Sequence, residues 1–308
     1  ELRSYNKLLF AGFVLGAGIS GFLSNIEDWQ FYESLIKSDK EGILAALLGL
    51  ATSKRGSGDS KITKVLSVHI RALLPEEAQD SLTISPLVEH SAIIALGLLY
   101  LGQADRYITS AFIRELKLFS IRKDEDVAAA DGRDVSIGIA LGLINQDKKN
   151  LADLIPFLDT PSDTPDIPFG VSSGCMCAIL LSYAGSNNKQ IADNLCLPET
   201  VLDSQYYPPH TFFTRMLVRH LVMWDDVTYT REWIESQIPK CYKQSNLDDM
   251  ADKDVISTLC YDFALVGIPI ALAMTQVSTH NQDLVAILLH YTENYYFLYI
   301  ADLHASLL

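Results

Sequence analysis

The histidines and aspartates that could form a metal or hydrolytic site gather in one part of the sequence. His220 lies within an apolar segment at residues 212–224, and His210, Asp225 and Asp226 flank it. Residue type alone supports a hydrolase or metal site here, whereas a packing or helix-capping role for His220 near the end of the predicted helix needs nothing further. We therefore favour the structural role.

Cys175 and Cys177 raise the question of a second metal site. Cysteines one residue apart point to different sides of a helix, and no second Cys or His pair stands at zinc-finger spacing. We expect both to be small buried core residues. The sequence also lacks HExxH and Walker motifs, so it predicts no catalytic residues, no metal and no cofactor.

Gly16, Gly18 and Gly21 form a literal G-x-G-x-x-G after an apolar run. In a dinucleotide-binding turn, this spacing lets the pyrophosphate approach a helix N-terminus closely. Such a turn also needs a following helix and a second strand that ends in an acidic residue. Here residues 25–33 lead instead into another glycine-marked segment, so an FAD- or NAD-dependent oxidoreductase is the remote alternative and a repeat helix is favoured.

Small residues recur within apolar segments along most of the chain. In five of the copies a small residue precedes a key Gly or Ala by four positions, which places both on one helix face where a neighbouring helix backbone can approach. The predicted structural repeat positions, turn glycines included, are Gly12, Gly16, Ala45, Gly49, Gly97, Gly102, Gly138, Gly142, Gly174, Ala178, Gly185, Gly267 and Ala271.

The intervals between these copies indicate a helical repeat array. Successive key positions are 33 to 48 residues apart, whereas the last interval of 93 residues has room for an atypical repeat at about residues 200–250. We predict an all-α protein, an α-solenoid of helix–turn–helix repeats that forms one domain over residues 1–308. Asp59 and Ser60 are candidate helix caps.

The clearest repeat is the hairpin at residues 88–116, in which a glycine-containing turn separates two apolar helical segments. Before it, we expect a helix over residues 62–74. After it, we expect an acidic exposed loop over residues 122–134. Three prolines at residues 159–168 predict a loop insert there.

Composition excludes some classes of partner. Of 308 residues 38 are acidic and 24 basic, and the net charge of −14 argues against nucleic acid or an anionic membrane as the main partner. The longest apolar run, residues 8–23, is shorter than the roughly 18–20 residues of a membrane-spanning helix.

Five scattered cysteines predict an intracellular protein. Because the chain begins without Met inside the repeat pattern, we expect a piece of a larger protein.

The copies resemble proteasome/cyclosome (PC) repeats, whose pattern is an Ala-x-x-x-Leu-Gly-Leu helix, a glycine-containing turn and a second helix. Residues 92–102 show it best. Residues 60–75 and 214–226 are similar to the repeat domain of the largest subunit of the anaphase-promoting complex, or cyclosome, and this similarity covers nearly the whole chain. Pro269 and Ala271 depart from the pattern.

The resemblance implies a fold and a role. The solenoid would curve into a horseshoe or toroid, although the six or seven visible copies leave ring closure open. The chain would be a non-catalytic scaffold of this ubiquitin ligase in the nucleus and cytoplasm, where it organises the Doc-domain, cullin and RING subunits and the WD40 coactivator. Trp224, Asp225 and Asp226 are candidate partner contacts. The alternative is a PC-repeat scaffold subunit of the proteasome regulatory particle.

Overall fold

The computed structural model describes residues 2–25, 39–75, 77, 83–118, 127–158, 169–200, 207–242, 255–277 and 281–293. Within these ranges every regular element is a helix, so the prediction of an all-α protein is confirmed. The expected loop insert at residues 159–168 lies outside the described residues. The chain divides into two compact units, and each is described by itself. Unit 1 comprises residues 1–154 and 167–182, and unit 2 comprises residues 155–166 and 183–308.

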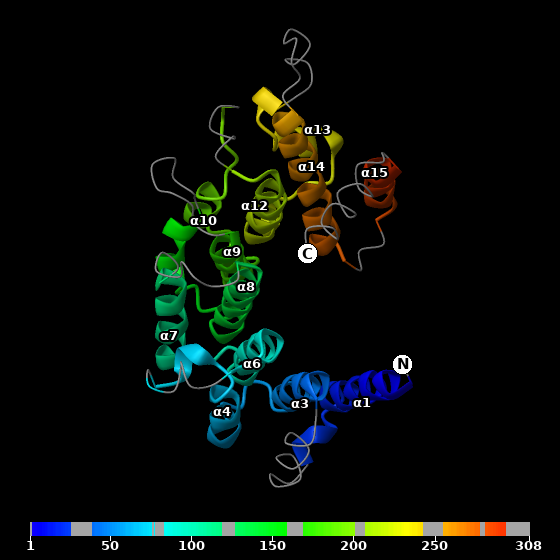
Figure 1. Cartoon of the computed structure of the whole chain (residues 1–308). Coiled ribbons are helices and arrows are strands. Elements are labelled where there is room, and N and C mark those ends of the chain that lie inside the picture. Colours follow the sequence, from blue (N-terminus) through cyan, green and yellow to red (C-terminus); the bar gives the residue numbers. More distant parts are fainter. Residues whose placement is uncertain are drawn as a thin grey trace. The chain divides into compact units, whose positions relative to one another are not determined.

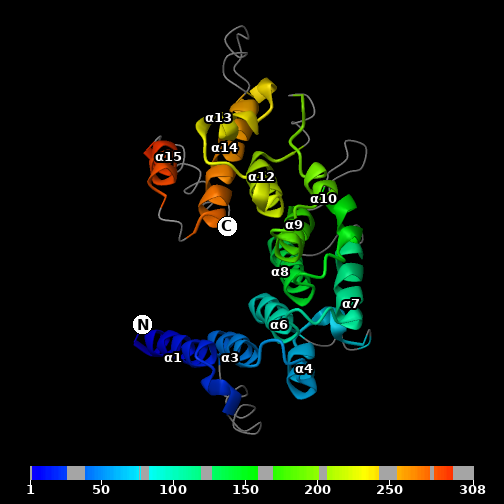
Figure 2. The same ribbon diagram turned by 180° about the vertical axis from the view of Figure 1, so that it is seen from behind.

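Unit 1 is built on a row of helices that pack one on the next (Figure 1). In chain order they are α1 (Leu2–Ile19), α3 (Lys40–Ser53), α6 (Pro86–Leu99), α8 (Val127–Ile144) and α9 (Phe169–Tyr183). Two further helices lie beside this row, α4 (Ser60–Ser67) on α6 and α7 (Arg106–Lys117) on α8 (Figure 2). Short 3₁₀ helices occur at η1 (Phe22–Asn25), η2 (Arg71–Leu73) and η4 (Ala152–Phe157).

The helices beside the row are amphipathic, as an edge position requires. In α7, Ile108, Phe112 and Leu116 are spaced four residues apart and are all buried, whereas Tyr107 is 75% exposed. The helices of the row carry apolar residues on more than one face because each interior member has a neighbour on both sides.

Small residues lie where the helices of the row cross. A Cβ at Gly97 would lie 2.7 Å from the Cα of Ala140, and one at Gly138 would collide with the backbone of Gly174. Gly142 likewise lies against α9, with Leu181 as its nearest neighbour. Any side chain at these positions would push the two helices apart, which explains the small-residue pattern in physical terms.

Two of the repeat positions expected at helix crossings face open space. A Cβ at Gly12 or Gly16 would meet no atom within 4 Å. Beside them on α1, Leu9 is 56% and Phe13 is 73% exposed. Helix α1 therefore packs on α3 through one side only, and its opposite side is an apolar surface in unit 1.

Two local expectations were wrong. The helix expected over residues 62–74 ends at Ser67, because the side chain of buried Glu89 accepts a hydrogen bond from the backbone N–H of Arg71 at 3.0 Å and redirects the chain into η2. The loop expected over residues 122–134 is helical from Val127, where a run of three alanines has high helix propensity.

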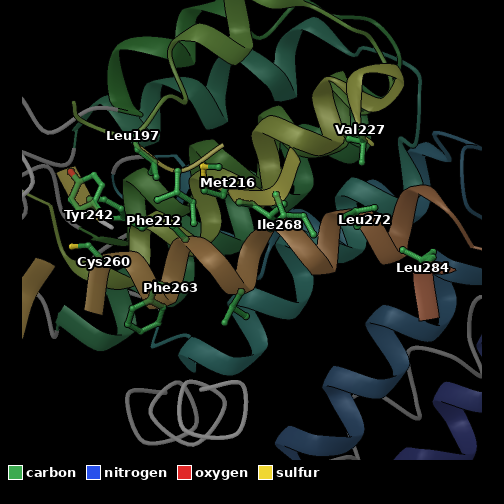
Figure 3. Close-up of a cluster of buried hydrophobic side chains, with 14 residues drawn as sticks. Leu197, Phe212, Met216, Val227, Tyr242, Cys260, Phe263, Ile268, Leu272 and Leu284 are labelled. Atoms are coloured by element: carbon green, nitrogen blue, oxygen red, sulfur yellow. The ribbon is translucent and has the colours of Figure 1, made fainter. Parts of the chain in front are cut away.

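Unit 2 is organised around two long helices, α12 (Pro209–Val222) and α14 (Val255–Thr275), that pack side by side. Around them lie α10 (Lys189–Asp193), η5 (Trp224–Asp226), α13 (Arg231–Ser236), η6 (Lys240–Tyr242) and α15 (Gln282–Glu293). Gly267 lies at the crossing, since a Cβ there would be 2.6 Å from the carbonyl oxygen of Phe213. Figure 3 shows the buried core between the two helices, with Phe212, Met216 and Ile268 among its members.

Helix α14 contains the one described segment, Thr258–Thr275, that is long and apolar enough to cross a membrane by length and composition. Half of this segment is buried inside the protein. Phe263, Ala264 and Ile268 contribute to the core of unit 2, so packing against α12 accounts for the apolar composition of the helix.

Asp262 is the exception on this apolar helix, and it leads to a prediction. Burial raises the pKa of its carboxyl to about 6, so at pH 7.5 the folded protein carries a poorly solvated charge there. We expect Asp262→Asn to raise the Tm at pH 7.5 and to give a smaller gain at pH 5, where the native carboxyl is already protonated. Thermal unfolding followed by circular dichroism at both pH values measures this. A gain that is equal at the two pH values would contradict the explanation.

Candidate functional site: the repeat turns

In the part of unit 2 that the structure describes, His220 is a core residue and takes no part in a catalytic arrangement. His220 is 3% exposed, its Nδ1 lies 2.6 Å from the carbonyl oxygen of Met216, and its Nε2 lies 3.3 Å from the side-chain amide of Gln237. Its ring packs edge-on against Trp233. Burial lowers the pKa of His220, so the imidazole is a neutral core group.

The lowered pKa of His220 predicts how stability depends on pH. Below about pH 6.5 the unfolded chain binds a proton that the folded protein excludes, so the unfolding free energy falls as pH falls, by at most about 1.4 kcal/mol per pH unit. We expect His220→Phe to lose less stability than the wild type between pH 7.5 and pH 5.5 in urea titrations. Equal pH dependences for the wild type and His220→Phe would contradict the prediction.

The cysteines expected in the core are found there. Cys175 is buried, and desolvation raises the pKa of its thiol to about 12, while Cys177 is partly buried and its pKa is also raised. Thiols in this state are poor metal ligands and poor nucleophiles. Among the described residues, no group of three or more His, Cys, Asp or Glu side chains could hold a metal ion.

The motif at Gly16, Gly18 and Gly21 does not form a phosphate-binding turn. Gly16 and Gly18 lie in the last turn of α1, and Gly18 lies against the backbone of Gly49, which blocks the approach of a ligand. The N–H of Gly21 donates to the carbonyl of Gly18 at 2.9 Å and is not free for an anion.

Residues 170–174 match G-x-S-x-G, the spacing around the catalytic serine of many hydrolases. A catalytic serine in this motif needs an exposed position on a sharp strand-to-helix turn. Ser172 instead lies inside helix α9 and is 5% exposed, and Gly174 packs against the backbone of α8. The arrangement gives no nucleophile.

Four turns of the repeat pattern share one backbone conformation. In each, two residues with φ between +51° and +69° are separated by one residue, and an Asp or Asn follows directly. We number them turn 1 (54–59), turn 2 (100–105), turn 3 (145–150) and turn 4 (183–188). The pairs are Gly56 and Gly58, Gly102 and Ala104, Asp147 and Lys149, and Gly185 and Asn187. Side chains with a Cβ disfavour this left-handed conformation, so an interaction beyond local preference is needed to stabilise it at a residue such as Ala104.

In turns 1, 2 and 4, backbone hydrogen bonds to a helix farther along the chain provide such an interaction. In these turns both left-handed residues donate their N–H to the last two carbonyls of a later helix, α6 for turn 1, α8 for turn 2 and α12 for turn 4. The bonds run from Gly56 to Leu98 (3.0 Å), Gly58 to Leu99 (3.0 Å), Gly102 to Leu143 (2.9 Å), Ala104 to Ile144 (2.8 Å), Gly185 to Leu221 (2.8 Å) and Asn187 to Val222 (2.9 Å). Each turn therefore fixes its own repeat to the next.

In turns 1, 2 and 4 the residue after the left-handed pair caps the helix that directly follows the turn. Asp59 accepts from the N–H groups of Lys61 and Ile62, Asp105 accepts from that of Ile108, and Asn188 caps α10 in the same way. Of the two caps expected at the start of α4, the structure selects Asp59. The turns thus combine a left-handed pair with an N-cap in a single short motif.

The candidate partner contacts lie at the end of α12. Trp224 is 37% exposed, and Asp226 is exposed. The carboxylate of Asp225 accepts a hydrogen bond from the side chain of Asn187 at 2.6 Å, and its own N–H donates to the Oδ1 of Asn187 at 3.1 Å. Asp225 therefore ties η5 to turn 4, whereas Trp224 and Asp226 remain exposed.

Comparison with known sequences defines the family. Residues 60–306 match the family described as the APC1 fifth domain. The chain belongs to the APC1 fifth-domain family. It is 29% identical to anaphase-promoting complex subunit 1 of Schizosaccharomyces pombe over 92% of its length, and 26% identical to that of Homo sapiens over 77%. It is also 27% identical over 83% to a negative regulator of mitosis from Emericella nidulans.

Membership in the APC1 fifth-domain family confirms the resemblance to the largest cyclosome subunit. The chain covers 20% of the Schizosaccharomyces pombe relative, 14% of the human one and 13% of the Emericella nidulans one. It therefore corresponds to one domain of these longer proteins.

The sequence patterns missed part of this family member's turn motif. Gly102 and Gly185 were expected as turn residues, but Asp147 and Lys149 carry no glycine signal although they adopt the same conformation. In all four turns an Asp or Asn directly follows the second left-handed residue. This recurring residue is the sequence signal that would have aligned the four turns with one another.

Proposed function

We propose that this chain is a non-catalytic scaffold module of an anaphase-promoting complex, a multi-subunit ubiquitin ligase of the cell cycle. The match of residues 60–306 to the APC1 fifth-domain family carries the proposal, because two of the relatives described above are named as subunit 1 of that complex. The module acts in the nucleus and cytoplasm. Its contribution to ubiquitination is positional, since it holds other subunits in place.

The geometry of the repeats supports a scaffold role. Helices that cross at small residues, and turns that donate two backbone hydrogen bonds to a later helix, join each repeat firmly to its neighbour. Repeat proteins of this kind present extended surfaces whose shape follows from the rotation between repeats. We propose that the repeats form an α-solenoid curved into a horseshoe or toroid, and that it organises the Doc-domain, cullin and RING subunits and the WD40 coactivator.

The first test is affinity purification of the full-length protein with and without residues 1–308, followed by mass spectrometry of the co-purifying subunits. The proposal predicts that cullin, RING and Doc-domain subunits co-purify with the intact protein and that at least one of them is lost on deletion. Unchanged recovery of every subunit would refute the scaffold role of this module. Recovery of proteasome ATPases would assign the chain to the proteasome regulatory particle.

A point-substituted version tests the contact at the end of α12. We expect Trp224→Ala combined with Asp226→Ala to reduce recovery of one subunit at least threefold and to leave the Tm unchanged, because both side chains are exposed. The matched control is Tyr107→Ala with Asp153→Ala, which also removes an exposed aromatic ring and an exposed acid. Equal recovery with both double variants would remove Trp224 and Asp226 from the interface.

A further inference from the structure

Exposed basic side chains gather along the turns of unit 1. Arg55 lies in turn 1, Arg106 directly follows turn 2, and Lys148 and Lys149 lie in turn 3, and all four are exposed. We call these four residues the basic edge. A cluster of this kind is unexpected in a chain with a net charge of −14.

The nearby acids do not neutralise the basic edge. The carboxylates of Asp59 and Asp105 accept backbone hydrogen bonds as helix caps, and Asp59 also pairs with Lys54 at 3.7 Å. Asp147 is the exposed acid within turn 3. In the part of the chain that the structure describes, none of the four side chains of the basic edge makes an ion pair or a side-chain hydrogen bond.

The backbone beneath the basic edge is held in place. Turn 1 is bonded to the end of α6 and turn 2 to the end of α8, so the three turns follow the ends of consecutive packed helices. Neighbouring helices pack roughly 8–10 Å apart, which spreads the basic edge over about 20 Å. An extended peptide rises about 3.3 Å per residue, so about six residues span this distance.

We propose that the basic edge binds an acidic, Asp- and Glu-rich segment of another protein in an extended conformation. The proposal rests on charge complementarity. Basic side chains spread over three turns can pair with carboxylates spread along an extended peptide. The binding of an acidic segment does not depend on the proposed scaffold function. The proposal rests on that function only where it takes the other protein to be another subunit of the same complex.

The same geometry disfavours a single phosphate group as the ligand. Phosphate sites use backbone N–H groups and free helix N-termini. Here the N–H groups of Gly56, Gly58, Gly102 and Ala104 already bind carbonyls, and aspartates cap the helices that follow turns 1 and 2. The net charge of −14 likewise opposes a long nucleic acid.

The test measures binding of a fluorescein-labelled peptide, three repeats of Glu-Glu-Asp-Gly, to the purified chain by fluorescence anisotropy. We expect binding that weakens at least threefold when NaCl rises from 50 to 200 mM. We also expect no binding of the uncharged analogue, three repeats of Gln-Gln-Asn-Gly. The variant R55E/R106E/K148E/K149E should lose at least tenfold in affinity for the acidic peptide.

The matched control reverses four exposed basic residues away from the turns, in the variant K40E/K64E/R114E/K117E. It makes the same change in net charge and should bind within threefold of the wild type. Equal losses in the two variants would show that net charge alone matters and would overturn the proposal, as would the absence of binding to the wild type. Tighter binding of a singly phosphorylated Gly-Ser peptide, or of a single-stranded oligonucleotide, would replace the acidic segment with that ligand.

Two further measurements make the result decisive. Circular dichroism spectra and Tm values of both quadruple variants show whether the fold is retained, and R55Q/R106Q/K148Q/K149Q provides a milder version if the reversed chain unfolds. Peptide binding does not depend on the subunits recovered in affinity purification. Failure of the basic edge is therefore distinguishable from failure of the scaffold function.

Discussion

Gly138→Ala is expected to lower the free energy of unfolding of the purified chain by about 3 kcal/mol. The new methyl group would collide with the backbone of Gly174, and a backbone cannot rotate away as a side chain can. Helices α8 and α9 would have to separate, which would weaken contacts along both. This cost exceeds the roughly 1 kcal/mol that alanine gains over glycine inside a helix. Urea denaturation followed by circular dichroism measures the difference.

Gly12→Ala is the matched control for this prediction. Gly12 also lies inside a helix of unit 1, but a Cβ there meets nothing within 4 Å. The helix-propensity gain therefore acts alone, and we expect the unfolding free energy to rise by up to about 1 kcal/mol. The same substitution should thus have opposite signs at the two positions. If both variants were equally stable, helix crossing at small residues would not explain the pattern.

The small-residue pattern made the row of helices predictable. A requirement for close approach leaves few residue types at a crossing, so Gly97 and Gly138 are visible in the sequence as small residues within apolar runs. The same pattern marked Gly12 and Gly16, which meet no neighbour. A small-residue pattern indicates only that the surface of a helix can accept a close neighbour. The fold of the whole chain decides whether a neighbouring helix lies there.

Features that depend on contacts between distant residues were not predictable. The helix expected to run to residue 74 ends at Ser67 because of Glu89, which lies 18 positions from its partner Arg71. The left-handed Lys149 carries no local signal for that conformation, since lysine does not favour it. The sequence pattern indicates local preference, and at the end of α4 the tertiary contact with Glu89 overrides it.

The candidate contact site was predictable only in part. The segment at residues 224–226 was noted as acidic and aromatic, but its internal use by Asn187 was not visible, because the two lie 38 positions apart. The basic edge was missed for a related reason. Its residues belong to three separate turns, and only the stacking of repeats brings Arg55, Arg106 and Lys148 onto one side of unit 1.

In unit 2, Phe212→Ala is expected to lower the free energy of unfolding by about 4 kcal/mol. Phe212 is fully buried between α12 and α14, and its ring packs edge-on against Tyr242 at 5.7 Å (Figure 3). Truncation removes this contact and leaves a cavity beside Met216 and Cys260, whose helices are held too firmly to close it. Trp224 and Trp233 lie in this unit and Trp29 lies in unit 1, so tryptophan fluorescence during urea denaturation in a Trp29→Phe background reports on unit 2.

Two controls separate cavity formation from other effects of the substitution. Phe13→Ala removes the same ring from a site that is 73% exposed, so its effect on stability should stay within about 0.5 kcal/mol. Tyr242→Phe keeps the ring beside Phe212 but deletes the hydroxyl that donates to the Pro198 carbonyl at 3.0 Å, which should cost about 1 kcal/mol. If Phe212→Ala cost no more than Tyr242→Phe, the core between α12 and α14 would not be what stabilises unit 2.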